Sequence, residues 1–401
     1  MQTRTRFRLV GVLCLILVSV PVTVWGQMGD SPWKRHTLAR MAAYQQDTSA
    51  EAEAVHQEAE EPGQDDDDAH LATELNNWAE VYRDQGQYTE AELLYQRALE
   101  IREKALGPEH PDVAVSLNNL AEMYHTQGKY GEAESLFLRS LAIREKVLGP
   151  EHPDVAGSLN NIASLYHDQG KYADAEPLYQ RSLAIWEKAL GTEHPDVAIS
   201  LNNLAELYHA QGNYAEAEPL FQRSLAIREK DLGPEHPDVA TTLNTLAGLY
   251  HTQGQYGEAE PLFQRSLAIW EKVLGEEHPT VATTLNNLAG LYHTQGKYEE
   301  AEPLYQRSLA IAEKVLGAEH PDVAYSLNNL AGLYHTQDQY EEAEPLYQRA
   351  LAIFEKVLGP EHPNVAQVLA SYADLLRKMG REDEAAKMEA RAQAIRAQRD
   401  Q

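Results

Sequence analysis

Leu117-Asn118-Asn119-Leu120-Ala121 returns 42 residues later as Leu159-Asn160-Asn161-Ile162-Ala163 and again as Leu201-Asn202-Asn203-Leu204-Ala205. This register continues from about Ala72 to the C-terminus. A fixed period of this size indicates stacked supersecondary units, because one such unit cannot bury its apolar face alone. The 401 residues therefore count repeats rather than globular domains. We predict eight repeats within residues 72–401: 72–113, 114–155, 156–197, 198–239, 240–281, 282–323, 324–365 and a terminal capping repeat 366–401.

Each repeat is predicted to be a hairpin of two helices. In repeat 114–155, apolar residues recur at helical spacing from Leu117 to Tyr124, and Gly128 interrupts the pattern. A second apolar stripe then runs from Ala133 to Val147. The predicted fold class is therefore all-α.

Capping residues set the expected helix ends. We expect the first helix to start just after Asp112, whose carboxylate can accept hydrogen bonds from the free amides of the first turn. The same position holds Asp154, Asp196, Asp238, Thr280, Asp322 and Asn364. We expect the second helix to end at Leu148, because Gly149 can take the left-handed C-cap conformation and Pro150 cannot continue a helix. Five prolines are expected near the start of the second helix, where a missing amide hydrogen has little effect: Pro177, Pro219, Pro261, Pro303 and Pro345.

The last repeat departs from the pattern on one face. Glu382 stands where the other repeats have a residue such as Tyr130, and Glu389 stands where they have an aromatic residue such as Phe137. Leu376 replaces a tyrosine. A terminal repeat has no following neighbour, so its outer face is expected to be polar.

Residues 1–26 have the composition of a signal peptide. They contain Arg4, Arg6 and Arg8, an apolar run from Leu9 to Val20, and the small-residue cleavage site Val24-Trp25-Gly26. We expect an exported protein, periplasmic or secreted, whose mature chain begins near Gln27 and lacks the single cysteine, Cys14. The alternative is an uncleaved N-terminal anchor, although the run is shorter than the roughly 20 residues that span a bilayer. We expect no membrane span in the mature chain.

Residues 27–70 are predicted to form an acidic linker. Within them, residues 32–61 are a candidate for a degenerate helical hairpin, because Trp33, Leu38, Met41 and Tyr44 could form one apolar stripe. The run from Asp65 to Asp68 is interpreted as a solvated connector rather than a metal site, since blocks of like charge usually stay solvated.

The charge balance bears on the partner. Lys and Arg number 34 against 62 Asp and Glu, which gives a formal net charge of -28. A nucleic-acid-binding protein needs a basic stripe to displace counterions, and the repeats contain no run of Lys and Arg. We therefore expect no nucleic-acid binding, and a protein or peptide partner that is neutral or basic.

Numbering each repeat so that Ala114 is position 1, several positions are nearly invariant along the chain. Position 8 is alanine in every repeat: Ala79, Ala121, Ala163, Ala205, Ala247, Ala289, Ala331 and Ala373. Position 20 is alanine from Ala91 to Ala385, position 17 is tyrosine from Tyr88 to Tyr340, and a glycine follows the first helix in all repeats except the one with Asp338. This pattern resembles the tetratricopeptide repeat (TPR) family over more than 300 residues.

The repeats depart from the common 34-residue form of that family. They are 42 residues long, and position 32 holds Glu103, Glu145, Glu187 and their equivalents where the family usually has proline. This longer form resembles the repeats of kinesin light chains and related bacterial proteins. The resemblance implies a right-handed superhelical solenoid of TPR helical hairpins whose inner face, lined by the first helices, binds extended peptides. It does not imply motor function, because residues 1–70 contain no counterpart of the heavy-chain-binding heptads.

The asparagine pairs are the first candidates for contacts to a peptide. Position 5 is Asn76, Asn118, Asn160, Asn202, Asn244, Asn286 and Asn328, and position 6 is Asn77, Asn119, Asn161, Asn203, Asn287 and Asn329. Asparagine is a mediocre helix former, so its amides are expected to bond something, and an amide suits any peptide backbone. We assign position 6 to peptide binding and position 5 to structure. The alternative is that one asparagine of each pair joins neighbouring helices.

Two histidine columns follow the repeats. The first is His125, His167, His209, His251, His293 and His335, and the second is His110, His152, His194, His236, His278, His320 and His362. Packed helices lie roughly 8–10 Å apart, whereas zinc ligands at about 2 Å from the metal must nearly touch. We therefore predict no metal site. The first column is expected to border the peptide groove, and the second to bond the backbone of the connector.

Differences between the copied repeats should determine specificity. Position 9 is Glu80, Glu122, Ser164, Glu206, Gly248, Gly290 and Gly332, so we predict that Glu122 and Glu206 lie in an acidic first half of the groove and that the second half is roomier. Position 31 is Arg102, Arg144, Trp186, Arg228, Trp270, Ala312 and Phe354. These residues form either a second contact surface or internal packing.

Two non-catalytic functions compete. The first hypothesis is a scaffold that binds an extended segment of another exported protein, and the alternative is a structural solenoid for self-association or for assembly of an envelope complex. The sequence contains no nucleophile elbow, phosphate-binding glycine loop or Cys-His cluster, so we predict neither an enzyme nor a cofactor.

Overall fold

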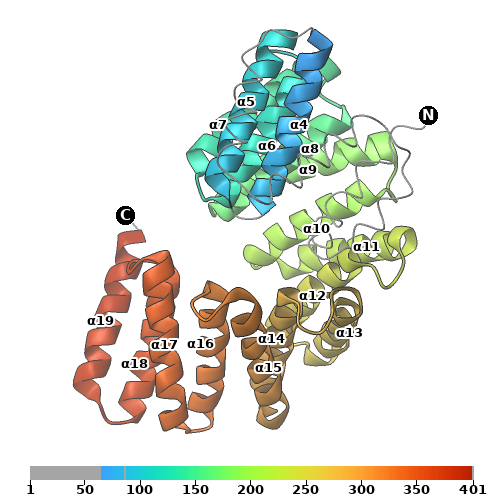
Figure 1. Cartoon of the computed structure of the whole chain (residues 1–401). Helices are drawn as coiled ribbons and strands as arrows, with labels where there is room; N and C mark the ends of the chain where they lie inside the picture. The colour runs from blue at the N-terminus through green and yellow to red at the C-terminus, as the bar shows by residue number, and fades with distance from the viewer. Residues whose placement is uncertain (1–64, 85–86, 400–401) are drawn as a thin grey trace, which may run out of the picture. The chain divides into compact units, whose positions relative to one another are not determined.

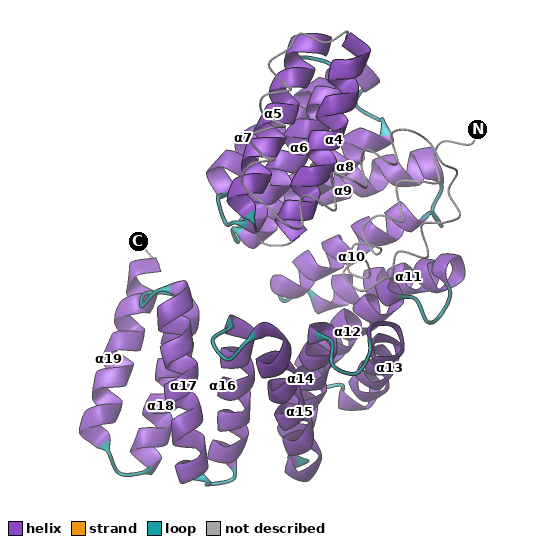
Figure 2. Cartoon of the chain, viewed as in Figure 1, coloured by secondary structure: helices purple, strands orange, loops and turns teal. Residues whose placement is uncertain are grey.

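The computed structural model describes residues 65–84 and 87–399, and these residues form helices joined by short turns (Figures 1 and 2). No strand occurs among them, so the all-α prediction is confirmed. The sixteen helices of the described chain are α4 (Asp65–Asp84), α5 (Tyr88–Leu106), α6 (Pro111–Thr126), α7 (Tyr130–Leu148), α8 (Pro153–Asp168), α9 (Tyr172–Leu190), α10 (Pro195–Ala210), α11 (Tyr214–Leu232), α12 (Pro237–Thr252), α13 (Tyr256–Leu274), α14 (Pro279–Thr294), α15 (Tyr298–Leu316), α16 (Pro321–Thr336), α17 (Tyr340–Leu358), α18 (Pro363–Lys378) and α19 (Glu382–Arg399).

The first helices begin two residues earlier than the sequence indicated, and a different residue caps them. In α12 the N-cap is His236, whose Nδ1 accepts a hydrogen bond from the backbone amide of Asp238 at 3.1 Å. The same contact is made by His110, His194, His278, His320 and His362. The prediction that the aspartates are the caps is wrong, because the proline between them is already the first helical residue. The second histidine column was expected to bond the connector backbone, but it bonds the backbone of the first turn of the helix that follows.

The second helices end where the sequence predicted. Gly149 follows Leu148 with φ 86° and ψ 155°, a positive-φ conformation outside the left-handed helical region that was expected, and its amide donates to the carbonyl of Glu145. The prolines differ from the expectation. Pro219 is the sixth residue of α11 rather than part of its first turn, so it removes one helical hydrogen bond. The Pro219 ring is exposed. The backbone carbonyl four residues earlier, which loses its helical hydrogen bond, is therefore on the solvent side of the helix.

Glycine between the two helices of a repeat also has positive φ, for example 77° at Gly212. In repeat 7 this position is Asp338, which adopts φ 61° and whose carboxylate accepts a hydrogen bond from the Tyr340 hydroxyl at 2.5 Å. Aspartate is one of the few side chains that tolerate this left-handed conformation. The exception to the glycine pattern therefore keeps the same turn.

Small residues let the helices of a repeat approach closely. Ala205 and Ala217, at positions 8 and 20 of repeat 4, are fully buried and belong to one apolar cluster with the aromatic ring of Phe221. Second helices then pack on the first helix of the following repeat, as α11 does on α12 and α13 on α14. In the C-terminal unit the core is therefore a series of such clusters along the stack rather than a single centre.

The chain divides into two compact units between Leu165 and Tyr166. In the C-terminal unit the first helices of neighbouring repeats, such as α12 and α14, contact one another more closely than neighbouring second helices do. The first helices therefore lie on the inner side of the local stack. Their surfaces form a strip that runs from repeat to repeat.

Several sequence predictions lie outside the described residues: the signal peptide, the cleavage near Gln27 and the candidate hairpin 32–61. The acidic run is an exception, because α4 begins at Asp65 and includes it. Acidic residues at a helix N-terminus interact favourably with the positive end of the helix dipole. The run from Asp65 to Asp68 therefore starts a helix, whereas its composition predicted a solvated connector.

Candidate functional site

Each first helix carries a surface stripe made of positions 2, 6, 9 and 13, which we call the first-helix stripe. Spacings of three and four residues place these positions on one face of a helix. In repeat 4 the stripe consists of Ile199, Asn203, Glu206 and Ala210, all exposed or half-buried. The stripe contains the predicted asparagines of position 6 and the predicted glutamates, and the first histidine column adjoins it at position 12.

Asparagines of neighbouring repeats are bonded to one another in a series that we call the asparagine ladder. The position-6 Nδ2 donates to the position-5 Oδ1 of the preceding repeat: Asn161 to Asn118 at 3.0 Å, Asn287 to Asn244 at 3.2 Å and Asn329 to Asn286 at 3.2 Å. Asn119 instead donates to Oε1 of Glu80 at 3.3 Å. The structural alternative therefore applies to position 6 as well as to position 5. A peptide-binding role for position 6 stays a prediction.

The ladder is interrupted where position 6 is not asparagine. Position 6 is Thr245 in repeat 5 and Ser371 in repeat 8, and the buried Oδ1 atoms that precede them, those of Asn202 and Asn328, have no hydrogen-bond partner. The Thr245 hydroxyl donates instead to the backbone carbonyls of its own helix. These two interruptions follow from the loss of one amide donor, whereas the Oδ1 of Asn76 is unpaired because Asn119 bonds Glu80 instead.

The predicted glutamates are held by the ladder. Nδ2 of Asn118 and of Asn161 donate to Oε1 of Glu122, at 2.6 and 2.9 Å. Asn202 donates in the same way to Glu206 at 2.9 Å. Burial raises the pKa of Glu206 above its ordinary value, and the hydrogen bond from Asn202 acts in the opposite direction. These carboxylates are therefore oriented by the ladder.

The first histidine column is half-buried and bridges repeats. Nε2 of His209, His251 and His293 lies 3.4, 3.1 and 3.0 Å from the hydroxyl oxygen of Thr252, Thr294 and Thr336. Each threonine hydroxyl already donates to the carbonyl four residues earlier, at 2.8–2.9 Å. The hydroxyl must therefore accept from the imidazole, which assigns the proton of the neutral ring to Nε2. Burial lowers the pKa of these three histidines.

The repeats were compared with known protein families and structures. The model of the tetratricopeptide repeat family matches seven overlapping segments: 70–146, 116–181, 154–230, 196–272, 238–314, 280–356 and 322–398. The chain belongs to the tetratricopeptide repeat family. TPR proteins are generally interaction scaffolds, so a protein-interaction scaffold is the broad function of this chain.

Solved TPR structures are similar to this chain. A putative kinesin light chain with nearly identical TPR-like repeats from Podospora anserina is 34% identical, with a TM-score of 0.46, and the match covers 52% of this chain and 98% of that one. BtubC (BKLC) from P. vanneervenii is 26% identical over 58% of this chain and 92% of that one, with a TM-score of 0.48. Aspartyl phosphate phosphatase F from Bacillus subtilis is 15% identical over 86% and 88%, with a TM-score of 0.56, and shares the fold. No curated protein matched.

A tyrosine network between the TPR repeats was missed at the sequence level. The Tyr250 hydroxyl donates to Oε1 of Glu218 at 3.0 Å and accepts from Nε2 of Gln222 at 3.0 Å, both on the preceding second helix. The same triad recurs at Tyr124, Tyr208, Tyr292 and Tyr334. Constant separations of 28 and 32 residues between tyrosine, glutamine and glutamate were the available signal.

The capping repeat keeps this network by a different route. Its position 11 is Leu376, but Tyr372, one turn earlier, donates to Glu344 at 2.7 Å and accepts from Gln348 at 2.8 Å. The Tyr372 hydroxyl thus bonds the glutamate and the glutamine of the preceding second helix from a position one turn earlier in the first helix. The replacement of the tyrosine is therefore compensated within α18.

The glutamate at TPR position 32 has a partner in the next repeat. Arg265 donates to Oε1 of Glu229 at 2.6 Å and to the connector carbonyl of Pro234 at 3.0 Å. The pair recurs at Arg139–Glu103, Arg223–Glu187, Arg307–Glu271 and Arg349–Glu313. This contact explains why the longer repeat has glutamate where the family usually has proline.

Position 31 serves as packing between first helices. Nη1 of Arg228 donates to the carbonyl of Asp238 at 3.0 Å and to Oγ1 of Thr242 at 2.6 Å. Arg144 makes the equivalent contacts with Asp154 and Ser158 at 3.2 and 2.7 Å. Burial lowers the pKa of both arginines. Internal packing is thus the role of the arginines at this position.

Reactive and membrane-spanning features were also sought in the described part of the chain. There, no group of three or more His, Cys, Asp or Glu side chains is arranged to hold a metal ion. None of the helices within residues 65–84 and 87–399 combines the length and apolar character required to cross a bilayer.

Proposed function

We propose that the first-helix stripes of neighbouring repeats bind an extended segment of a partner protein. This proposal rests on a contrast, within each repeat, between the residues that bond neighbouring repeats and the residues of the exposed stripe. The tyrosine network and the arginine–glutamate pairs that bond the repeats are nearly copied along the chain, whereas the exposed stripe varies at positions 2, 9 and 13, although Glu122 and Thr252 of that stripe also bond a neighbouring repeat. Copied contacts serve stacking, so varied and exposed positions are where a partner can be distinguished.

Apolar side chains exposed on the stripe support the proposal. Val115, Ile199 and Tyr325, all at position 2, are 38%, 40% and 44% exposed. They alternate with half-buried amides and carboxylates that can bond a peptide backbone. Exposed apolar side chains beside fixed polar groups are typical of surfaces that bind extended chains.

The test compares the two faces with matched substitutions. The variant V115E/I199E introduces two carboxylates on the first-helix stripe, and V147E/V273E introduces two at equally exposed valines of the second helices, which are 48% and 42% exposed. Each full chain is used as bait for envelope extract, and retained proteins are quantified by mass spectrometry. We expect V115E/I199E to lose about tenfold or more of its bound partner, because a buried uncompensated charge costs more than about 1.4 kcal/mol.

The control is V147E/V273E, which should retain the partner like the unmodified chain. Circular dichroism of all three chains checks that helicity is unchanged. Equal loss in both variants, or retention by V115E/I199E, would contradict binding at the first-helix stripe. A chain that forms concentration-dependent oligomers by light scattering and retains no other protein would favour the structural alternative.

We also propose that the protein is exported, on the basis of the composition of residues 1–26. N-terminal sequencing of the protein from the periplasm or the medium should then begin near Gln27. A chain that keeps residues 1–26 and sediments with membranes would support the anchored alternative.

A further inference from the structure

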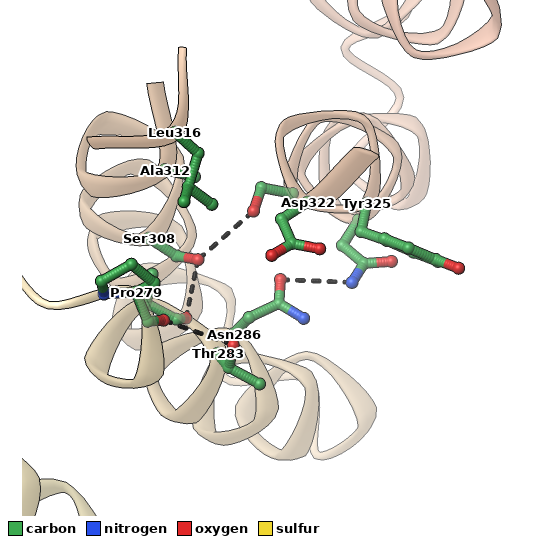
Figure 3. Close-up of a pocket in the computed structure, with 11 residues that line it drawn as sticks. Pro279, Thr283, Asn286, Ser308, Ala312, Leu316, Asp322 and Tyr325 are labelled. Carbon is green, nitrogen blue, oxygen red and sulfur yellow. Dashed lines mark hydrogen bonds between the residues drawn. The ribbon is translucent and has the colours of Figure 1, made fainter. Parts of the chain in front are cut away.

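A pocket of about 170 Å³ opens between α14, α15 and α16, all within the C-terminal unit (Figure 3). Figure 3 shows Ala312 of α15 facing Asp322 of α16, with Thr283 and Asn286 contributed by α14. Thr283, Asp322 and Tyr325 are exposed, so the pocket is accessible from solvent. Its volume is similar to that of engineered cavities of about 150 Å³ that hold one aromatic ring.

The pocket exists because one side chain is small. Position 31 of repeat 6 is Ala312, whereas Arg102, Arg144 and Arg228 occupy this position in repeats 1, 2 and 4. In those repeats the arginine side chain extends between two consecutive first helices. An alanine at the same place ends at Cβ and leaves the volume of that side chain vacant.

The acceptors that hold the arginine are retained around Ala312. In repeat 1, Nη1 of Arg102 donates to the carbonyl of Asp112 at 3.2 Å and to Oγ of Ser116 at 2.8 Å, and Nη2 donates to Oγ1 of Thr73 at 3.1 Å. The residues at the equivalent places around Ala312 are Thr283 and Asp322 of repeat 6 and Ser326 of repeat 7, and all three line the pocket.

We propose that this pocket binds the guanidinium group of an arginine side chain on the bound partner. The inference rests on the proposed function and names one side chain of its ligand. Asn329, which belongs to the asparagine ladder and to the first-helix stripe, also lines this pocket. A peptide segment bound along the stripe would therefore lie over the opening of the pocket. The net charge of -28 favours a cationic ligand.

The walls of the pocket fit the rest of an arginine side chain. Pro279, Ala282 and Leu316 offer apolar surface to its methylene groups. Tyr325 lies at the edge of the pocket, where its ring packs against Phe354 with ring centroids 4.9 Å apart and points away from the cavity (Figure 3). The Asp322 carboxylate supplies the charge that the Coulomb attraction of Asp238 supplies to Arg228.

Other occupants fit the pocket less well. Trp186 and Trp270 fill position 31 in repeats 3 and 5, so an indole has the right size. An indole has one N–H, however, and would leave acceptors unbonded, whereas a guanidinium has five donors in a plane. A lysine ammonium has three donors but no planar fork and is more strongly hydrated. Arginine is therefore the occupant that satisfies this lining.

The first experiment fills the pocket from within the chain. The variant A312R places a guanidinium where Arg228 has its own, and we expect the thermal midpoint of the full chain to rise by about 2 °C or more. The gain should shrink when Ser326 is changed as well, in A312R/S326A compared with S326A. An A312R chain that is folded but no more stable would overturn the assignment.

The second experiment uses the unmodified full chain and therefore does not depend on how A312R folds. Acetyl-Ala-Arg-Ala-amide is titrated into chain labelled with ¹³C at alanine methyl groups, and the Ala312 signal is assigned from A312S. We expect a saturable shift of that signal, with binding about tenfold weaker for the citrulline and lysine tripeptides. No saturable shift, or equal or tighter binding of the citrulline or tryptophan tripeptide, would overturn the proposal.

The two proposals can fail separately. If the arginine tripeptide shifts Ala312 but no partner is lost with V115E/I199E, the pocket assignment stands and the proposed function fails. If the partner is lost with V115E/I199E but the tripeptide does not shift Ala312, the proposed function stands and the arginine assignment is wrong.

Discussion

Single residues decide whether one repeat is bonded to the next. Asn202 is 5% exposed and donates to Glu206, yet its Oδ1 has no partner because Thr245 lacks an amide. An unpaired buried acceptor costs about 1–3 kcal/mol. The interface between repeats 4 and 5 is therefore predicted to be weaker than an interface in which this Oδ1 atom is bonded, such as the one between repeats 5 and 6.

The variant T245N should repair that interface. An asparagine at position 245 can donate from Nδ2 to Oδ1 of Asn202, as Asn287 does to Asn244 at 3.2 Å. We expect a gain of about 1 kcal/mol, because a net hydrogen bond contributes about 0.5–1.5 kcal/mol. Urea denaturation of the full chain measures this as a higher midpoint at unchanged slope.

The control for T245N is the same substitution in a chain that already carries N202A. Removing the acceptor should abolish the gain, since the new amide then has no Oδ1 to bond. A gain that persists in T245N/N202A would show that the stabilisation has another origin.

At the scale of the element, the first helix is started by two consecutive residues. Pro237 supplies a φ already suited to the helix, and His236 bonds the amide of Asp238. The aspartate lies in the first turn, where its charge complements the helix dipole, but it does not cap. A side chain two residues before the free amide reaches it more readily than the side chain attached to the same residue.

The variants H236A and H236N separate capping from other roles of the histidine. H236A should destabilise the chain by about 0.5–2 kcal/mol, whereas H236N should lose much less, because asparagine is a preferred N-cap. Thermal unfolding monitored at 222 nm by circular dichroism checks both. If H236N loses as much stability as H236A, the imidazole acts by something other than its acceptor nitrogen.

At the scale of the whole molecule, the same inter-repeat contacts recur many times, so a small effect at each repeat adds along the chain. Burial lowers the pKa of His167, His209, His251, His293 and His335. The unfolded chain then binds more protons than the folded chain between these lowered pKa values and the ordinary value of about 6.5. Stability is fully present above about pH 6.5 and is lost as the pH falls through the lowered pKa values.

We therefore expect the thermal midpoint to fall between pH 7.5 and pH 5. The variant H209Q/H251Q/H293Q provides the comparison, because glutamine Nε2 can donate to the same threonines but does not titrate. Its midpoint should fall less over this range. An equal fall in the variant would show that other groups cause the pH dependence.

Much of the molecule could be predicted from the sequence. A period of 42 residues, alanines at positions 8 and 20 and glycines after each helix determined the hairpins, the ends of the second helices and the polar last repeat. These features depend on residues close together in the chain, where helix spacing alone places side chains. The positions facing outward on the first helices were predictable for the same reason.

Only the tertiary structure decided which side chains meet across repeats. The asparagine ladder joins residues 43 positions apart, as in Asn161 and Asn118, and the tyrosine network joins residues 28 and 32 apart. The position-6 asparagines Asn161, Asn287 and Asn329, which the sequence pattern assigned to a ligand, bond position-5 asparagines of the preceding repeat. Ala312 leaves a pocket because its side chain is smaller than the arginine at the equivalent position of other repeats. Such contacts depend on the distance and rotation between stacked hairpins, which the spacing within one helix does not set.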